Sequence, residues 1–554
     1  MKNKRKSKKS KQKLTVTKPP KLSKKELAAQ KRKAANQRQE VIKAIATFGS
    51  IGAVIGLMLL LTGKVKIAIA GGGGAAILML SYKYPRQALW AFLIYLPFSG
   101  TVTYWIGGGN VLFQIAKDAF YFPALIALIQ NCKKKRLPIL IPKNLIVTFS
   151  IVLVLALLTL IFANGALQLS NLKGQKPILQ GILGLKVLIG YMALIPCMYY
   201  LIRNKKDLLL FTRMHLMLAI ACCTLGLIQY LMLKTGRCQG TRGMVGIQLF
   251  KATTNAKCLV GGALVYSPEV NMIRLPGTFV APWQWAWFLI SNSFLTFASA
   301  FSETSFIWRT MGLFGMALVF VNAFISGQRA ALIGVPAALV ILLFITGQVV
   351  NFRRFIPIGV TFTILLCIGA ATNPAEVEQR WDSFVSRWNA SPPQQFLFNQ
   401  FQQSHNFIDG HLLGIGVGRA TNSTRSLGYV QLIETYQPKL LYELGYPGAI
   451  AFQVMLLHLT FLTFKAYRSV RDRSLRIYGA SFWVFIAFIS INPQYYPLDV
   501  DPVAVYYWVL VGIIIKLPKI DRQLEEEKHQ KFDFENLPEH QNLKNKKIIQ
   551  SSPI

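Results

Sequence analysis

Long apolar stretches, separated by short polar connections, run along almost the whole chain. A helix that spans a membrane needs about 20 consecutive, predominantly apolar residues. The pattern therefore predicts an all-α polytopic membrane protein with about 14 transmembrane helices, within a range of roughly 12–14, and one large exterior loop. The stretches lie at 44–62, 65–82, 87–106, 111–131, 144–163, 182–202, 208–232, 281–301, 306–326, 331–349, 355–372, 447–465, 477–493 and 503–517.

One connection, 373–446, is much longer than the others and carries the runs GHLLGIGVGRATN and ETYQPKLLYELGYPG. Irregular backbone can be hydrogen-bonded only outside the hydrocarbon, so a polytopic protein is expected to work in such a loop. We expect a polybasic cytoplasmic tail at 1–43, transmembrane helices at 44–372 and 447–517 on either side of the loop, and a second cytoplasmic tail at 518–554. The stretch at 87–106 is ambiguous, because Pro97 and Gly100 interrupt it.

Composition supports a membrane protein and excludes a mainly disordered chain. Hydrophobic residues make up 53% and charged residues 15%, and the mean hydropathy is +0.39. Much of the net charge of +40 lies in residues 1–43, where 17 Lys or Arg face only Glu26 and Glu40. This tail has no aromatic residue to stack on a base, so we expect it to lie on anionic membrane lipid and not on nucleic acid. No removable signal peptide is predicted.

The distribution of Lys and Arg predicts the orientation. Basic residues collect in cytoplasmic loops. If the N-terminus is inside, the basic connections 133–136, 203–206, 353–354 and 465–476 all fall on the cytoplasmic side. Both termini are then cytoplasmic, and the loop at 373–446 is exterior.

Two of the seven cysteines, Cys238 and Cys258, share one predicted exterior connection. They are either two free thiols or a disulfide in an oxidising compartment. The other five lie in or beside apolar stretches, where Cys is an ordinary core residue.

Five arginines are predicted near the exterior face: Arg274, Arg329, Arg380, Arg387 and Arg419. Any single one fits a side chain that reaches a lipid headgroup or forms a local ion pair. Because a guanidinium binds phosphate oxygens in a bidentate manner, the group as a whole favours an anionic ligand such as a lipid-linked pyrophosphate. Gly414, Gly416 and Gly418 form a GxGxG run, which predicts a tight turn that approaches a ligand or another segment.

These motifs together resemble the O-antigen ligase and Wzy-type polymerase superfamily of bacterial membrane glycosyltransferases. The resemblance covers roughly residues 110–515 and, more loosely, the chain is similar to the HpsL family of cyanobacterial hormogonium polysaccharide clusters. It is carried by SGQRAA with Ser326 and Arg329, QRWDSFVSRW with Arg380 and Arg387, GIGVG, and a loop end with Leu441, Glu443, Gly445 and Gly448 at the family spacing.

The resemblance implies transfer of a glycan from a polyprenyl-pyrophosphate to a sugar hydroxyl, at the exterior face of a bacterial plasma (inner) membrane. Arg329 and Glu434 are then the expected catalytic residues, and no metal or other cofactor is expected. Glu434 replaces the histidine of the family ligases, which favours a polymerase-like or divergent member. A carboxylate is a weaker base, so His405 or His411 are alternatives. Substrate binding is expected at Arg274, Arg380, Arg387, Arg419, His411 and Lys439.

Two other functions stay open. Lys117, Asp118 and Lys186 lie inside apolar stretches, and they form either a transport pathway or a structural ion pair. The chain is alternatively a lipid-linked glycan flippase or transporter, or a non-catalytic subunit of a polysaccharide export machine. In each case, other polysaccharide assembly proteins are candidate partners.

Overall fold

The computed structural model describes residues 24–348 and 392–535, apart from short gaps at 62, 111–112, 114–115, 139–142, 171–173, 250–252, 268–271 and 495–496, and only scattered residues from 349 to 391. The predicted all-α polytopic membrane fold is confirmed. In the described part, ten helices are long and apolar enough to cross a membrane, and α14 is a shorter apolar helix. The predicted stretch at 355–372 lies almost entirely outside the described residues.

The first half of the chain folds into helices with several interruptions. The elements are α1 (Lys24–Leu60), α2 (Val65–Lys83), α3 (Pro85–Tyr95), η1 (Leu96–Phe98), α4 (Ser99–Thr101), η2 (Val102–Ile106), α6 (Asp118–Lys134), α7 (Lys143–Leu158), η3 (Thr159–Asn164), α8 (Gly165–Leu169), α9 (Pro177–Ile189), η4 (Gly190–Ala193), α10 (Leu194–Leu201) and α11 (Lys205–Lys234). The ambiguous stretch at 87–106 is thus a broken helix, α3 to η2, with Pro97 inside η1.

The second half holds one small hairpin and the most deeply buried helices. Its elements are η5 (Gly246–Leu249), η6 (Thr254–Ala256), β1 (Val265–Ser267), β2 (Met272–Arg274), α12 (Pro282–Ser302), α13 (Phe306–Ile325), α14 (Arg329–Ile345), α17 (Pro393–Phe407), η9 (Asn422–Thr424), α18 (Tyr436–Arg468), α19 (Arg473–Ile491), η10 (Pro497–Asp499) and α20 (Val503–Glu535). β1 and β2 pair antiparallel.

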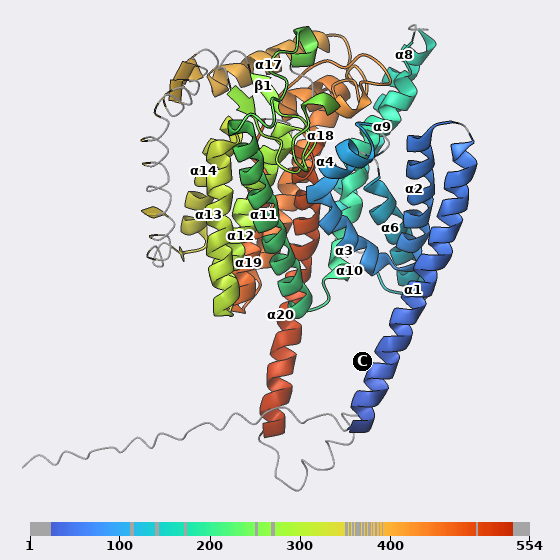
Figure 1. Cartoon of the computed structure of the whole chain (residues 1–554), viewed down its shortest axis with the longest axis vertical. Helices are drawn as coiled ribbons and strands as arrows, with labels where there is room; N and C mark the ends of the chain where they lie inside the picture. The colour runs from blue at the N-terminus through green and yellow to red at the C-terminus, as the bar shows by residue number, and fades with distance from the viewer. Residues whose placement is uncertain are drawn as a thin grey trace, which may run out of the picture.

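The bundle has two distinct ends (Figure 1). The start of α1 and the end of α20 project from one end, here called the tail end. The hairpin, α8 and α17 lie at the opposite end, here called the loop end. The described part of the long predicted loop is therefore on the side opposite the start of α1 and the end of α20, as the alternating topology requires. Which end faces the cytoplasm stays a prediction.

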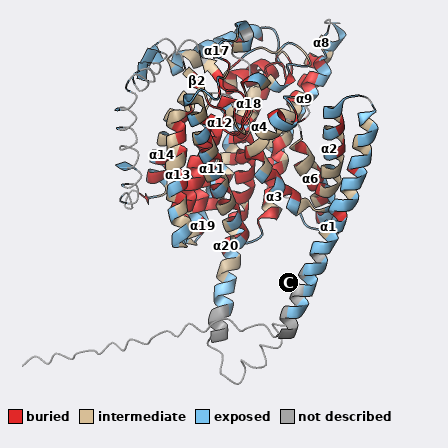
Figure 2. Cartoon of the chain, viewed as in Figure 1, coloured by how far each residue is buried: buried red, intermediate tan, exposed pale blue. Residues whose placement is uncertain are grey.

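The core is centred on α12 and α20, while α1 and α2 lie at the side of the bundle and are largely exposed (Figure 2). Every residue of α12 from Trp285 to Ser302 is buried. The helix packs against α11, α13, α14, α19 and α20, so protein surrounds it on all sides. This explains how it tolerates polar residues such as Ser291, Asn292 and Thr296, whose side chains bond to carbonyl oxygens of α12 itself.

Candidate functional site

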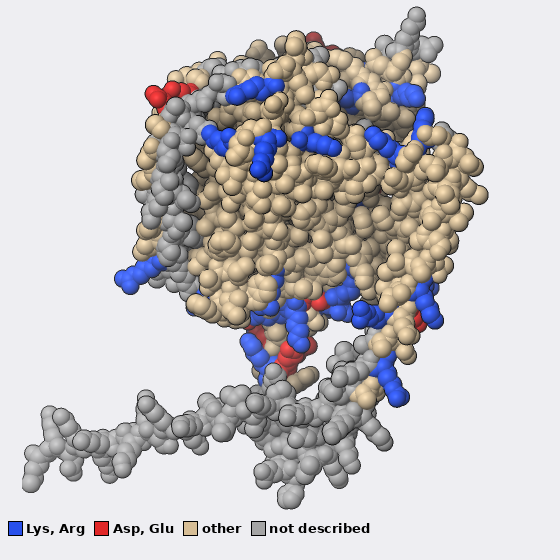
Figure 3. Space-filling model, in the orientation of Figure 1, with Lys and Arg blue, Asp and Glu red and all other residues tan. Residues whose placement is uncertain are grey.

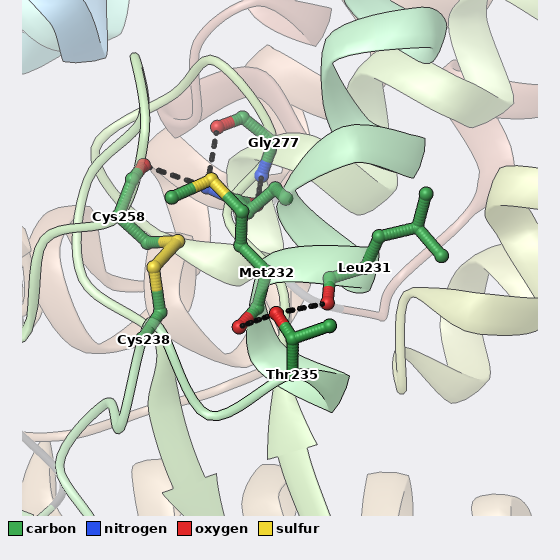
Figure 4. The surroundings of a disulfide bond; sticks show 7 residues. Leu231, Met232, Thr235, Cys238, Cys258 and Gly277 are labelled. Atoms are coloured by element: carbon green, nitrogen blue, oxygen red, sulfur yellow. Dashed lines mark hydrogen bonds between the residues drawn. A yellow bond between two sulfur atoms is a disulfide. The ribbon is translucent and has the colours of Figure 1, made fainter.

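The connection between α11 and α12, residues 235–281, forms a folded cap at the loop end. A disulfide joins Cys238 to Cys258, with a Cα–Cα distance of 5.8 Å (Figure 4). Buried Gln229 of α11 donates to the carbonyl oxygens of Cys258 and Gly277 at 3.1 and 3.2 Å, and accepts from the Gly277 N–H at 3.0 Å. The disulfide thus crosslinks the cap internally, and the three hydrogen bonds of Gln229 attach it to α11.

The hairpin of the cap touches the turn that precedes α14. Arg274 ends β2, and the next residue, Leu275, donates its N–H to the carbonyl oxygen of Ser326 at 3.0 Å. In the same turn Gly327 has a φ of +68°. A methyl group there would lie 3.2 Å from the carbonyl oxygen of Ile273, so glycine suits both the conformation and the close approach.

Arg329 is the first residue of α14, directly after this turn. Its side chain is half-buried, and no hydrogen bond or ion pair reaches it from the described residues. The backbone of Arg274 therefore lies against the turn that leads into Arg329, so the two arginines predicted from separate motifs are carried by adjoining segments. The positive end of the α14 dipole lies at Arg329.

The GxGxG run forms the predicted tight turn. Gly414, Gly416 and Gly418 have φ values of +71°, +128° and +80°, which favour glycine. The turn approaches other segments of the chain. A methyl group on Gly418 would lie 2.4 Å from the carbonyl oxygen of Gln180 in α9, and one on Gly414 would lie 2.5 Å from the amide nitrogen of Gly445 in α18. The run therefore acts as a wedge between α9 and α18.

Two buried amide side chains hold this wedge in place. Asn164, the last residue of η3, donates to the carbonyl oxygen of Val417 at 3.0 Å and accepts from the Val417 N–H at 2.9 Å. It also donates to the carbonyl oxygen of Pro177 at 2.9 Å. Gln180 of α9 donates to the carbonyl oxygens of Gly418 and Tyr429. Neither residue is predicted from the sequence, because both lie among apolar residues far from the loop.

Arg419 follows the wedge directly and is 7% exposed. Its Nη1 donates to the side-chain oxygen of Gln175 at 2.9 Å and to that of Gln180 at 3.5 Å, while its Nε has no hydrogen-bond partner. In the described part of the chain no carboxylate lies within ion-pair distance of this guanidinium. A buried cation held by neutral amides can attract an anion, so Arg419 fits its predicted role.

Glu443 and Lys439 of α18 are buried beneath the wedge. Glu443 accepts from the Ala420 N–H at 2.7 Å and from the Thr421 hydroxyl at 3.0 Å. Lys439, predicted as a substrate ligand, is 2% exposed and forms an ion pair with Asp499, and it lies 4.0 Å from Glu443. A lysine enclosed in this way holds α18 to the turn before α20, and we do not assign it to substrate.

Glu434 opens a run of polar residues at the start of α18. It is half-buried, its N–H donates to the side-chain oxygen of Gln400 at 3.0 Å, and no described residue bonds its carboxylate. Three buried side-chain atoms that follow have no hydrogen-bond partner: the Thr435 hydroxyl, the Tyr436 hydroxyl and the Gln437 Oε1. Buried polar atoms are nearly always bonded, so each of these atoms is expected to bind water or another polar group.

The two candidate histidines, His405 and His411, have different environments. His405 of α17 makes a 2.9 Å hydrogen bond with the Tyr446 hydroxyl. His411 is exposed, and its N–H closes a turn to the Ile408 carbonyl oxygen. No hydrogen bond joins either imidazole to Glu434 in the described part of the chain.

The charged residues predicted inside apolar stretches are paired. Lys186 of α9 lies 2.6 Å from Asp118 of α6. Lys117 pairs with Asp501, which also accepts from the Tyr191 hydroxyl at 2.8 Å. The two pairs join α6, α9 and the turn before α20, which agrees with the structural interpretation of these charges.

The structure thus brings together some predicted residues and separates others. Arg274 adjoins Arg329, while Arg419 belongs to the wedge. No hydrogen bond or ion pair connects Arg329 to Glu434 within the described residues. Arg380 and Arg387 lie outside the described residues. In the described part of the chain, no three His, Cys, Asp or Glu side chains lie close enough to hold a metal ion.

Comparison with known protein families and with curated proteins finds no match. Among solved structures, one similar chain comes from work described as "Structural coordination of polymerization and crosslinking by a peptidoglycan synthase complex". It is 14% identical, with 67% of this chain and 96% of that chain covered and a TM-score of 0.31. A likeness at this level carries no argument about function. The helices and their burial define the chain as a multi-pass helical membrane protein.

Proposed function

We propose that the protein is a membrane glycosyltransferase that polymerises or ligates a polyprenyl-pyrophosphate-linked glycan at the loop end of the bundle. The proposal takes its reaction from the resemblance to O-antigen ligases and Wzy-type polymerases. The observation that carries it is the contact between β2 and the turn before α14, which places Arg274 beside Arg329. An arginine at a helix N-terminus, with a second arginine on the adjoining strand, suits a pyrophosphate at the membrane surface.

In the proposed reaction an acceptor sugar hydroxyl attacks the anomeric carbon of the lipid-linked glycan. A new glycosidic bond forms while the bond between the anomeric carbon and the phosphate oxygen breaks. The polyprenyl pyrophosphate leaves with the electron pair of that bond, and Arg329, together with Arg274, stabilises its negative charge. Glu434 takes the proton of the acceptor hydroxyl, for which its unbonded carboxylate is suited.

Replacement of Arg329 and Glu434 tests this proposal in cells that produce the polymer. R329A should abolish polymer at normal protein level, and R329K should restore only part of it, because an ammonium group cannot bind pyrophosphate as a bidentate fork. E434Q keeps the shape and removes the base, so it should also abolish polymer. R425A removes an exposed arginine of the same loop and is the matched control. Normal polymer in both R329A and E434Q would contradict the enzymatic function.

A lipid-linked glycan transporter is the second candidate, because Lys117, Asp118 and Lys186 lie inside apolar stretches, and charges inside a membrane protein can mark a transport pathway even where they are paired. Deletion of the protein distinguishes the functions. Single repeat units on lipid outside the cell indicate a polymerase, and full-length chains retained on lipid indicate a ligase. Repeat units trapped inside indicate a transporter.

A further inference from the structure

The cap carries a charge that a purely structural exterior connection would not be expected to have. Residues 235–281 contain five basic residues (Arg237, Arg242, Lys251, Lys257 and Arg274) and a single acidic one, Glu269. The longer loop at 373–446 has five basic and six acidic residues. Exterior connections of this length are normally poor in Lys and Arg, because such residues oppose translocation.

Several of these cations are held in fixed positions at the surface. Lys257 lies 4.2 Å from the ring centre of Trp105, and Arg242 lies 5.2 Å from that of Tyr266. Lys66 of α2 reaches the same turn as Trp105, because a methyl group on Gly108 would lie 2.4 Å from its Nζ. The ring of Trp105 restricts the Lys257 ammonium group without cancelling its charge.

The cations also share one side of the molecule. In the view of Figure 3, Lys and Arg form a row along the loop end, above a wide uncharged belt and with one group of acidic residues at the left edge. Arg237 and Arg242 are exposed, and the Cys238–Cys258 disulfide fixes the segment that carries them. A rigid cationic band beside the proposed transfer site can hold a long anion through many weak contacts.

We propose that the cap binds an acidic polysaccharide, a chain whose sugar residues carry carboxylate or sulfate groups, and guides it at the loop end. This inference rests on the proposed function, because the bound polysaccharide would be the substrate or product of the transferase. The substrate class of the transferase is then an anionic glycan. The cap surface, and not the long loop, makes the contact.

Binding is measurable without catalysis, with the full-length protein in nanodiscs of zwitterionic lipid. The probe is fluorescently labelled alginate, a polyuronate, with dextran of equal length as the neutral comparison. We expect alginate and not dextran to bind, and added salt to weaken binding about tenfold or more, as for other polyanions. Equal binding of dextran, or no binding of alginate at low salt, would overturn the inference.

Charge reversal localises the site. The double variant R237E/R242E should weaken alginate binding roughly tenfold or more. The matched control is K133E/K134E, which makes the same charge change at exposed positions of the tail end. An equal loss in both variants would show a general effect of net charge and would reject the cap as the site. If R237E/R242E leaves alginate binding unchanged and instead lowers the anionic lipid that copurifies, the cap binds headgroups and the inference fails.

Failure of this inference is distinguishable from failure of the proposed function. R329A should bind alginate as the unmodified protein does, because Arg329 lies outside the cap. If R329A still makes polymer, the transferase is rejected while alginate binding at the cap stands. If R329A makes none and R237E/R242E binds alginate normally, only the cap assignment is rejected.

Discussion

Asn164 offers the most direct test of how the loop end is built. The residue is fully buried and makes three hydrogen bonds, two to Val417 and one to Pro177. N164A removes all three and leaves the buried N–H and carbonyl groups of Val417 without these partners, while the Pro177 carbonyl oxygen keeps the helical hydrogen bond of the first turn of α9. Each such group costs about 1–3 kcal/mol. Because relaxation recovers part of this cost, we expect the wedge to lose about 3 kcal/mol of local stability.

The rate of amide hydrogen exchange in the wedge measures this loss of local stability. The N–H groups of Ile415 and Gly416 bond to the carbonyl oxygens of Tyr442 and Glu443, so their exchange requires the wedge to leave α18. A loss of about 3 kcal/mol should speed exchange of the segment 411–421 roughly 100-fold, since each 1.4 kcal/mol is tenfold. Mass spectrometry of the protein in nanodiscs measures this rate by peptide.

Q168A is the matched control for N164A. Gln168 lies one turn further along, is exposed, and makes one long hydrogen bond of 3.4 Å to the Ile178 N–H. Its loss should leave exchange at 411–421 within about twofold of the unmodified protein. If hydrogen exchange at 411–421 is unchanged in N164A, or rises equally in Q168A, then Asn164 does not hold the wedge in place.

Three further predictions follow from the same contacts. In otherwise cysteine-free protein, an impermeant thiol reagent added to intact cells should label S423C and not K135C, and the reverse would invert the orientation. Cys238 should resist alkylation until reductant is added, and C238S should cost about 3 kcal/mol because the bridged residues are 20 positions apart; a free thiol there in non-reduced protein rejects the bridge. K439M should lower thermal stability by the equivalent of about 3–5 kcal/mol by leaving Asp499 buried and unpaired, with much of the loss recovered in K439M/D499L; no loss in K439M would show that the pair is dispensable.

The sequence predicts the parts of the site that have a local signature. A GxGxG run forecasts positive φ, and the structure has it at Gly414, Gly416 and Gly418. Asn164 and Gln180 have no such signature. The local sequence around a single amide in an apolar helix is the same whether the side chain faces solvent, lipid or a loop more than 200 positions away. Only the packing of α9 against the wedge shows which groups Asn164 and Gln180 bond.

Lys439 shows the converse problem. Its charge and its place near the loop made it a candidate substrate ligand. Its partner, Asp499, comes 60 positions later, in a turn between two helices whose return to α18 no local pattern indicates. Charges near a predicted surface cannot be divided into free and paired ones until such contacts are known. The same uncertainty applied to Lys117 and Lys186, which proved to be paired.

The charges at the loop end therefore fall into two groups with different physical roles. Lys439, Lys117 and Lys186 are each paired with a carboxylate, that of Asp499, Asp501 and Asp118 respectively. A balanced, mostly buried set fixes helices against one another and attracts little from outside. The cap is different, because its five basic residues face a single acidic residue in the sequence. An anionic glycan that approaches this end should therefore meet the cap before it meets the long loop. R237E/R242E should accordingly change the association rate constant, which it lowers, more than the dissociation rate constant.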